Sequence, residues 1–495
     1  MGGQTLQTET HVREQVSRAT NRPRPDVQNA RSRRAFQSEW TPALLYLSLD
    51  VVSWLTIYGL VNLLRHPGYA GAGAKEVYFI GILRLVVIIQ ALFIIGGYNR
   101  HTETRSLSYA AEHVLAIIGA ALVSAFLVYG AAAFAESIKP SRSVLLVSFI
   151  LFAPLSLGYR RWVRRFVAEV SATRTFLVIG SGEVVGRFKR AYEEAANPER
   201  LEFVSIENEA GETRSGHLIA NGRGDVADKI DNLDERYSGI ILAEPPGRLH
   251  PDVIERLVRT QFQRTRVYTL ESFYETHWRY VPLNVIDPVW PLQTGFQLAR
   301  ISPYHHLKRV LDIVLSGLLL VIFAPVIAVA ALLIWVEDRR PVIFAQERVG
   351  RDERPFTMYK FRTMRTAAGQ DEDIYTQRDD PRLLRVGRLL RRLRFDELPQ
   401  LWNVFRGEMS LIGPRPEWIR CVELYETKIP FYHFRHLVKP GITGWAQVNY
   451  PYGASEEDAM EKLKYDLYYI RHYSLKLDAM IVLKTVHTML FGRGR

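Results

Sequence analysis

Residues 308–336 read KRVLDIVLSGLLLVIFAPVIAVAALLIWV, a long apolar run with charge at its start and a proline in its middle. The run exceeds the roughly 20 residues that a helix needs to cross a bilayer. Pro325 lacks an N–H group and clashes with the preceding turn, so it bends a helix there. The segment after residue 336 is basic, which favours the cytoplasmic side. We therefore predict a re-entrant membrane helix over 309–336, which enters and leaves on one face.

Four further apolar stretches lie upstream, near residues 42–64, 77–97, 109–134 and 143–159. Each approaches or exceeds the length of a spanning helix. Four arginines follow within residues 160–165, and such an excess marks the cytoplasmic side. We predict a four-helix transmembrane region over 41–165, after a polar, disordered cytoplasmic tail over 1–40. The alternative is four buried helices of a soluble protein.

The chain has 495 residues, a formal net charge of +12 and one cysteine. Its length suggests about three domains. A single cysteine excludes an internal disulfide bond and fits a reducing compartment. Positive charge suits nucleic acid, anionic lipid or phosphorylated substrates. Because the arginines lie at membrane flanks and near carboxylates, and no recognition motif is visible, we do not expect nucleic acid as a partner.

Between 175 and 275, strand and helix patterns alternate, which is typical of a Rossmann-like parallel sheet and predicts such a domain over 170–280. The first strand runs into Gly180-Ser181-Gly182, which begins a dinucleotide fingerprint. Val185 stands where the third glycine belongs, and Glu207 is a candidate ribose-binding acid. Nucleotide binding and a purely structural turn are both open interpretations.

The sequence RFDELPQLWNV, residues 394–404, holds adjacent carboxylates at Asp396 and Glu397. At a helix N-terminus both can point into one cleft, and Pro399 suits the first turn. One carboxylate can attack phosphorus while its neighbour holds Mg²⁺. Most such pairs are solvated helix starts, so the pair needs support from its surroundings.

Basic residues supply that support. Lys360 and Arg362 lie two apart on a probable strand and hence on one face. Arg415 lies between two prolines, which stiffen its loop. Arginines and leucines alternate over 382–394, as in an amphipathic helix on an anionic membrane surface, although some of these arginines could instead grip a diphosphate.

A tight loop follows in PGITGWAQVNY, residues 440–450, where Thr443 and Gln447 are candidates to bind a nucleotide or sugar. Asp466 lies further on, among aromatic residues.

From about 305 to 495 the chain resembles the monotopic phosphoglycosyl transferases, bacterial sugar transferases that prime polysaccharide synthesis. The resemblance is carried by KRVLDIVLSGLLLVIFAPVI, VIFAQERVG, YKFRTM, RFDELPQLWNV, EMSLIGPRPE and PGITGWAQVN. The upstream helices and α/β unit are similar to those of the large members. Small members carry Ser-Pro at the helix bend, whereas Ala324 precedes Pro325 here.

The resemblance implies a catalytic domain over 305–495 in which Asp396 is the nucleophile and Glu397 a magnesium ligand. It also maps Lys360, Arg415 and Asp466 onto site residues of the family.

The implied reaction moves hexose-1-phosphate from a UDP-hexose, with glucose or galactose as the sugar, onto undecaprenyl phosphate, and UMP leaves. A phosphosugar-aspartate intermediate is expected, with the catalytic domain on the cytoplasmic face of the bacterial inner membrane. The product would start exopolysaccharide, O-antigen or capsule synthesis. A homodimer is compatible with a membrane protein of this size.

Two other functions are open. One is a non-catalytic membrane scaffold or regulator of polysaccharide assembly. The other is a membrane-bound nucleotide-sugar dehydratase, for which Tyr304 and Lys308 have the Tyr-x-x-x-Lys spacing but lie outside the sheet.

Overall fold

A computed structural model describes most of the chain and shows a mainly helical protein with small sheets. The described residues are 40–65, 74–99, 102, 104, 107–132, 141–171, 175–195, 199–204, 223–231, 233, 237–244, 249–263, 265–286, 290, 295–339, 341–365, 382–450, 453 and 455–491. The tail predicted before residue 40 and the candidate acid Glu207 lie outside these ranges. The chain divides into two compact units, one of which holds most of the N-terminal helices and the other residues 173–495.

The predicted N-terminal apolar stretches all form helices. They are α3 (Trp40–Arg65), α4 (Ala74–Ile94), α5 (Leu107–Ala132) and α6 (Arg142–Ser171). Among the residues described, Thr41–Arg65, Tyr109–Gly130 and Arg142–Arg165 are long and apolar enough to cross a membrane, while Phe79–Ile94 is shorter. By the same measure Tyr304–Asp338, further along, is the fourth candidate span.

A buried ion pair joins two of these helices. Asp50 of α3 and Arg160 of α6 are both fully buried, and the Arg160 guanidinium donates to both Asp50 oxygens, at 2.8 and 2.6 Å. The hydroxyls of Tyr98 and Tyr159 donate to the same carboxylate. A charge inside an apolar helix is tolerated when it is paired in this way.

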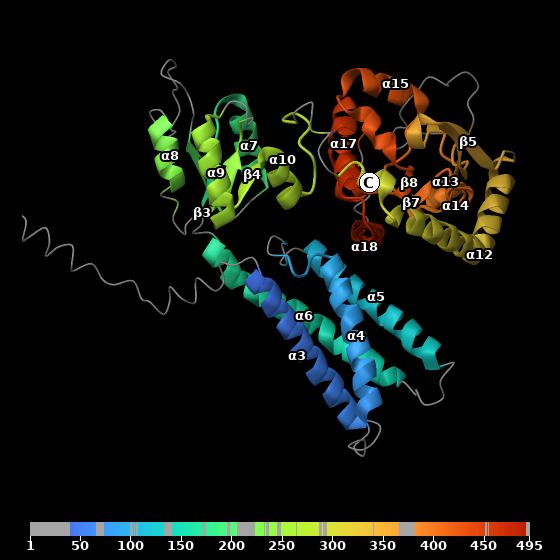
Figure 1. Ribbon diagram of the computed structural model, residues 1–495. Helices are drawn as coiled ribbons and strands as arrows, with labels where there is room; N and C mark the ends of the chain where they lie inside the picture. Colours follow the sequence, from blue (N-terminus) through green and yellow to red (C-terminus); the bar gives the residue numbers. More distant parts are fainter. Residues whose placement is uncertain are drawn as a thin grey trace, which may run out of the picture. The chain divides into compact units, whose positions relative to one another are not determined.

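Four strands form a parallel sheet in the order β2-β1-β3-β4. Its elements are β1 (Thr175–Ile179), α7 (Gly182–Glu194), β2 (Arg200–Val204), α8 (Arg223–Asp231), β3 (Tyr237–Leu242), α9 (Pro251–Gln263) and β4 (Val267–Thr269). Side chains alternate along β1, so that Phe176 and Val178 pack with α7 while Leu177 and Ile179 pack with α8 and α9. The sheet is therefore covered by helices on both faces (Figure 1).

The chain then continues through short elements into the C-terminal third. Those before the long helix are α10 (Leu270–Phe273), the π-helix η2 (Tyr274–Trp278) and α11 (Leu298–Ile301). Those after it, to the turn with the carboxylate pair, are β5 (Ile343–Val349), η4 (Arg351–Glu353), β6 (Pro355–Phe361), α13 (Arg385–Leu393) and η5 (Phe395–Glu397). The remainder are α14 (Gln400–Arg406), β7 (Ser410–Ile412), α15 (Ile419–Lys428), η6 (Tyr432–Leu437), β8 (Gly441–Thr443), α16 (Trp445–Asn449), α17 (Glu456–Arg471) and α18 (Leu475–Phe491).

The core of this third lies between α15, α17 and α18, where residues such as Val422, Leu467 and Ile481 are buried together. β5 and β6 form an antiparallel hairpin, and β7 pairs with β8 in parallel.

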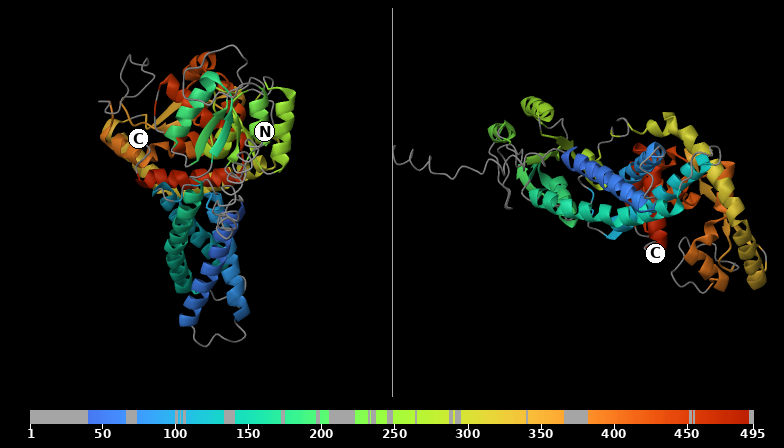
Figure 2. Two further views of the ribbon diagram at one scale, coloured as in Figure 1. Left: turned by 90° about the vertical axis from the view of Figure 1, so that its left-hand side faces the viewer. Right: turned by 90° about the horizontal axis from the view of Figure 1, so that it is seen from below.

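The long helix α12 spans Tyr304–Asp338, a few residues more at each end than predicted, and contains Pro325. Two views show it bending sharply near its middle (Figures 1 and 2), as an internal proline requires. Its apolar side chains remain largely exposed, with Val321 at 74% and Val329 at 56%.

Both halves of α12 are hydrogen-bonded to residues between 385 and 405. In the first half, Arg309 donates to the backbone carbonyls of Val404 and Phe405 on α14, at 2.7 and 2.9 Å. In the second half, Glu337 accepts the N–H groups of Arg385 and Val386, which begin α13, at 2.7 and 2.9 Å. The bent helix therefore holds the two helices that flank η5.

Candidate active site

The carboxylate pair lies in the turn between these two helices. Arg394 ends α13 in the left-handed conformation, with φ of 58°, and so reverses the chain. Asp396 and Glu397 then form the 3₁₀ turn η5, and Pro399 is the N-cap of α14. The preceding Phe395 packs against Phe323 of α12, with ring centroids 6.3 Å apart. The pair therefore lies directly before a helix, as predicted, and beside the middle of α12.

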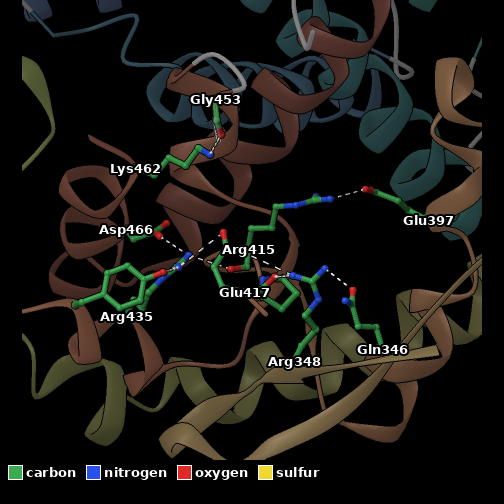
Figure 3. Close-up of polar contacts among 11 residues, drawn as sticks. Gln346, Arg348, Glu397, Arg415, Glu417, Arg435, Gly453, Lys462 and Asp466 are labelled. Atoms are coloured by element: carbon green, nitrogen blue, oxygen red, sulfur yellow. Dashed lines mark hydrogen bonds and ion pairs between the residues drawn. The ribbon is translucent and has the colours of Figure 1, made fainter. Parts of the chain in front are cut away.

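Glu397 is held by arginines. Arg415 Nη2 donates to Glu397 Oε1 at 3.0 Å, and Arg394 lies 3.8 Å from the same oxygen. Burial opposes ionisation, but Arg415 and Arg394 outweigh it and keep the pKa of Glu397 below its usual range. Figure 3 shows the Arg415 side chain reaching across to Glu397.

Asp396 has a different environment. Its Oδ1 is buried and has no hydrogen-bond partner within the described part of the chain. Burial and the neighbouring charge of Glu397 raise the pKa of Asp396 to about 6, although Arg391, Arg394 and Lys360 oppose the shift. A carboxylate that lacks hydrogen bonds keeps its lone pairs available for attack on an electrophile. The two adjacent acids are thus differentiated, one paired and one unpaired.

The positive charge of Lys360 acts on Asp396. Its ammonium lies over the Phe344 ring, 4.9 Å from the centroid. Burial, followed by the charges of Arg348, Arg415 and Arg391, lowers the pKa of Lys360 to about 8, while Asp396 opposes the shift. So many cations around one acid would suit a polyanion such as a diphosphate.

A buried network supports Arg415 from behind (Figure 3). Arg435 donates to the Arg415 backbone carbonyl at 2.9 Å and to Asp466 Oδ2 at 3.0 Å, and it also donates to the Tyr432 hydroxyl. Arg435 and Asp466 are both buried. Burial alone would lower the pKa of Arg435, but Tyr432, Asp466 and Glu417 outweigh it and hold that pKa above its usual value. Asp466 therefore reaches the pair indirectly, through Arg435 and the backbone of Arg415.

Sequence reasoning did not single out two residues near the acid pair, Arg435 and Arg348. Arg435 lies in η6 and nothing in its local sequence marks it. Arg348 lies within VIFAQERVG on β5, where its guanidinium donates to Gln346 Oε1 at 2.7 Å and to the Pro416 carbonyl at 3.4 Å. The contact with Pro416 places Arg348 against the loop that carries Arg415. The motif VIFAQERVG was the one feature of the sequence that could have indicated Arg348.

The structure corrects the strand position predicted for Arg362. β6 ends at Phe361, so Lys360 and Arg362 do not share a strand face. Arg362 instead pairs with Asp338 at 2.9 Å and donates to the carbonyls of Asp338 and Arg339. The cause is that the C-terminal end of α12, with its unsatisfied carbonyls, lies within reach of the guanidinium.

Two other predicted binding residues have structural contacts. The Thr443 hydroxyl is hydrogen-bonded to Thr485 of α18 at 2.7 Å. Gln447 Nε2 donates to the Ile442 carbonyl at 3.0 Å, while its buried Oε1 has no partner among the residues that the structure describes. Neither contact connects these side chains to the carboxylate pair.

The alternative catalytic pair Tyr304 and Lys308 begins α12, outside the sheet as expected. The Tyr304 hydroxyl and the Lys308 ammonium both donate to Asp478. Because both side chains donate to Asp478 of α18, Tyr304 and Lys308 connect α12 to α18.

The glycine loop of the sheet domain also has an internal partner. The Ser181 N–H and hydroxyl both donate to Glu244 Oε1, each at 3.2 Å. In a dinucleotide-binding loop this position, at the start of the helix, receives a diphosphate. Here a carboxylate from the end of β3 takes the equivalent hydrogen bonds.

A family model for bacterial sugar transferases matches residues 303–492. The UDP-N-acetylgalactosamine-undecaprenyl-phosphate N-acetylgalactosaminephosphotransferase of Aeromonas hydrophila is 40% identical over 270 residues, 54% of this chain and 63% of that protein. The undecaprenyl-phosphate glucose phosphotransferase of Komagataeibacter xylinus is 37% identical over 268 residues, 53% of this chain and 50% of that protein. The UDP-glucose:undecaprenyl-phosphate glucose-1-phosphate transferase of Caulobacter vibrioides is 44% identical over 212 residues, 42% of this chain and 79% of that protein.

The chain thus spans less than two thirds of the Aeromonas and Komagataeibacter proteins, with 63% and 50% of their lengths aligned. The 54% of this chain that aligns with the Aeromonas protein exceeds residues 303–495, so that similarity extends upstream of the matched family region. The Caulobacter protein, of which this chain covers 79%, is 44% identical to it. The family model matches residues 303–492 as well. This chain belongs to the bacterial sugar transferase family.

Proposed function

We propose that the protein transfers hexose-1-phosphate from a UDP-hexose to undecaprenyl phosphate and releases UMP. The observation that carries this proposal is the differentiated acid pair: Asp396 with a buried, unpaired oxygen, and Glu397 tied to Arg415. The names of the relatives, which contain undecaprenyl phosphate and nucleotide sugars, support the choice of acceptor and donor.

In the first step, the unpaired Asp396 oxygen attacks the phosphorus that bears the sugar. A bond forms between that oxygen and phosphorus, and the bond from phosphorus to the bridging oxygen breaks. UMP leaves with the electron pair, and hexose-phosphoryl aspartate remains. Lys360 and Arg415 bind the diphosphate and offset the negative charge that moves onto UMP.

Glu397 is the residue that would hold Mg²⁺. Within the described residues no three His, Cys, Asp or Glu side chains cluster as a metal cage. Such a site fits Mg²⁺, which binds through one or two carboxylates together with substrate phosphates and water. The ion, when bound, would neutralise charge on the diphosphate.

In the second step, an oxygen of undecaprenyl phosphate attacks the phosphorus of the intermediate. The bond from phosphorus to Asp396 breaks, and the carboxylate is restored. The acceptor is a membrane lipid, so the site must lie at the bilayer surface. The position of Phe395 against Phe323 supports this, because α12 beside it exposes apolar side chains such as Val321.

We further propose that α12 is re-entrant. Its first half is attached to α14 and its second half to α13, so both ends belong to one domain. A straight crossing would separate those ends by the thickness of a bilayer. On α13, Leu389 and Leu393 are exposed among arginines, as suits a helix on an anionic surface. The basic residues after the N-terminal helices support the cytoplasmic face of the bacterial inner membrane.

The upstream parts complete the proposed organisation. We assign a transmembrane region to 41–165, a Rossmann-like domain to 170–280 and the catalytic domain to 305–495. Because Glu244 takes the hydrogen bonds of the glycine loop, the Rossmann-like domain is proposed to use that turn structurally. A homodimer stays a prediction.

The test is UMP release by the full chain in membranes, with Mg²⁺, undecaprenyl phosphate and UDP-glucose or UDP-galactose as donor. UDP-N-acetylgalactosamine is included because the Aeromonas relative carries that sugar in its name. Asp396→Asn should abolish release, whereas Asp252→Asn, at an exposed position on α9, should leave it unchanged. Carrier-dependent release by Asp396→Asn at the parent rate would exclude the proposed nucleophile. No UMP from any donor would favour the scaffold function.

A further inference from the structure

The side chain of Asn403 on α14 is fully buried, and both atoms of its amide are hydrogen-bonded. Its Oδ1 accepts the backbone N–H of Tyr359 at 3.1 Å. Its Nδ2 donates to the backbone carbonyl of Thr357 and to Glu408 Oε2, both at 2.7 Å. These contacts fix the orientation of the amide, because a reversed amide would turn its oxygen towards two acceptors.

Two of these contacts hold the edge of β6 that faces away from β5. The two strands form a sheet of their own, so β6 pairs with a strand along one edge only. The other edge of such a strand presents N–H and C=O groups that need partners. Asn403 bonds a carbonyl and an N–H that are two residues apart, at Thr357 and Tyr359. Its amide therefore takes the place of a neighbouring strand.

Lys360 directly follows this held edge. It lies two residues after Met358 and so shares a face of β6 with it. Met358 is buried together with Val404, the residue after Asn403 on α14. The face of β6 that carries Lys360 is therefore turned towards α14, and its position depends on how β6 is attached to that helix.

The acid pair directly precedes the helix of Asn403. Only two residues separate η5 from α14, and β6 contacts both of these elements. The charge of Lys360 acts on Asp396 and on Glu397. Asn403 thus connects the segment that carries the acids to the strand that carries the lysine.

We propose that Asn403 is a positioning residue: by bonding the free edge of β6, it holds Lys360 where the lysine meets the diphosphate that Asp396 attacks. This inference rests on the proposed transfer, in which Lys360 binds the diphosphate. Because Asn403 is fully buried, it acts through Lys360 and does not itself touch the substrate.

The experiment is a double-mutant cycle on UMP release by the full chain in membranes, with Asn403→Ala, Lys360→Met and their combination. Asn403→Ala should lower kcat/KM by about a hundredfold, the loss that a displacement of about 1 Å can cause. The loss should divide between KM and kcat as it does for Lys360→Met. In the Lys360→Met background the same substitution should cost less than about threefold, because the lysine that Asn403 positions is gone. A residue that only stabilises the fold would cost the same in both backgrounds.

Gln261→Ala is the matched control, because Gln261 Oε1 also accepts the N–H of a strand residue, Val267, at 2.8 Å in the sheet domain. It should change kcat/KM in neither background. Folding is followed by circular dichroism. If Asn403→Ala does not fold, the cycle uses Asn403→Asp, which keeps the acceptor for Tyr359 and loses the donor to Thr357. That variant should lose about tenfold, as for one buried hydrogen bond, and only while Lys360 is present.

Equal losses in both backgrounds would overturn the positioning role and leave the proposed transfer intact, since the parent still releases UMP. If the parent releases no UMP, the transfer fails instead, and the same cycle is measured on the affinity for UDP by calorimetry. Losses of affinity that depend on Lys360 would then support the positioning role towards a diphosphate. Additive losses, or no binding of UDP by the parent, would overturn it.

Discussion

The two shifted groups at the site predict a bell-shaped pH profile for the first half-reaction. In the proposed reaction Asp396 must be ionised to attack, and its pKa is raised to about 6. Lys360 must be protonated to bind the diphosphate, and its pKa is lowered to about 8. The value of kcat/KM for the UDP-sugar should therefore rise with pH through about 6 and fall through about 8.

The size of the effect follows from these values. At pH 5, a carboxyl group with a pKa of about 6 is ionised in roughly one molecule in eleven. With the ordinary value of 3.8 it would be ionised in more than roughly nine in ten. We expect kcat/KM at pH 5 to be about a tenth of its plateau, and a similar loss at pH 9.

The assay is initial UMP release at low UDP-sugar concentration between pH 4.5 and 9.5, because kcat/KM reports ionisation of the free enzyme and donor. The phosphate of the acceptor lipid, which titrates in the same range, does not enter this ratio in a ping-pong reaction.

Arg391→Gln provides the sharper test. The charge of Arg391 lowers the pKa of both Asp396 and Lys360, so its removal should move both limbs to higher pH. Arg256→Gln, which alters a surface ion pair with Asp231 in the sheet domain, should move neither. A plateau that extends to pH 5 in protein whose circular dichroism is still native would refute the raised pKa of Asp396 and the profile built on it.

Three further substitutions test the supports of the site. Asp466→Asn should lower stability by about 1–3 kcal/mol, because buried Arg435 loses its charged hydrogen-bond partner while Glu417 stays 4.0 Å away, and a thermal melt that does not change would contradict this. Arg362→Gln should lower the melting temperature because the ion pair with Asp338 is lost, while KM for the donor stays near the parent value. A KM increase as large as that of a Lys360 variant would instead show that Arg362 binds the substrate. Glu244→Gln should cost only about 1 kcal/mol and leave UMP release unchanged, so a large loss of release would assign the glycine loop a role in catalysis.

Local patterns predicted many of the elements. β1 (Thr175–Ile179) ends directly before Gly180, as expected, and the alternation of arginine and leucine before the acid pair forms the helix α13. These elements follow from periodicity over a few residues, which sequence carries directly. The acid pair itself was found because adjacent carboxylates before a proline are visible in the sequence, although their catalytic roles stay predictions.

Long-range contacts were not visible in this way. Arg435 contacts Asp466 across 31 residues of sequence, and neither has a local signature of that pairing. Arg362 alternates correctly with Lys360, but the end of α12 at Asp338 takes its side chain. Which of several nearby cations meets a given carboxylate depends on tertiary packing, and a single sequence does not record it.

The attachment of both halves of α12 to one domain has an evolutionary consequence. Because Arg309 and Glu337 are hydrogen-bonded to α14 and α13 at either side of the bend, the position of Asp396 relative to α12 is set within residues 304–491. Upstream segments can then be exchanged, lengthened or lost without altering that position. Recombination can thus join residues 304–491 to different upstream regions while the bent helix and the acid pair keep their arrangement.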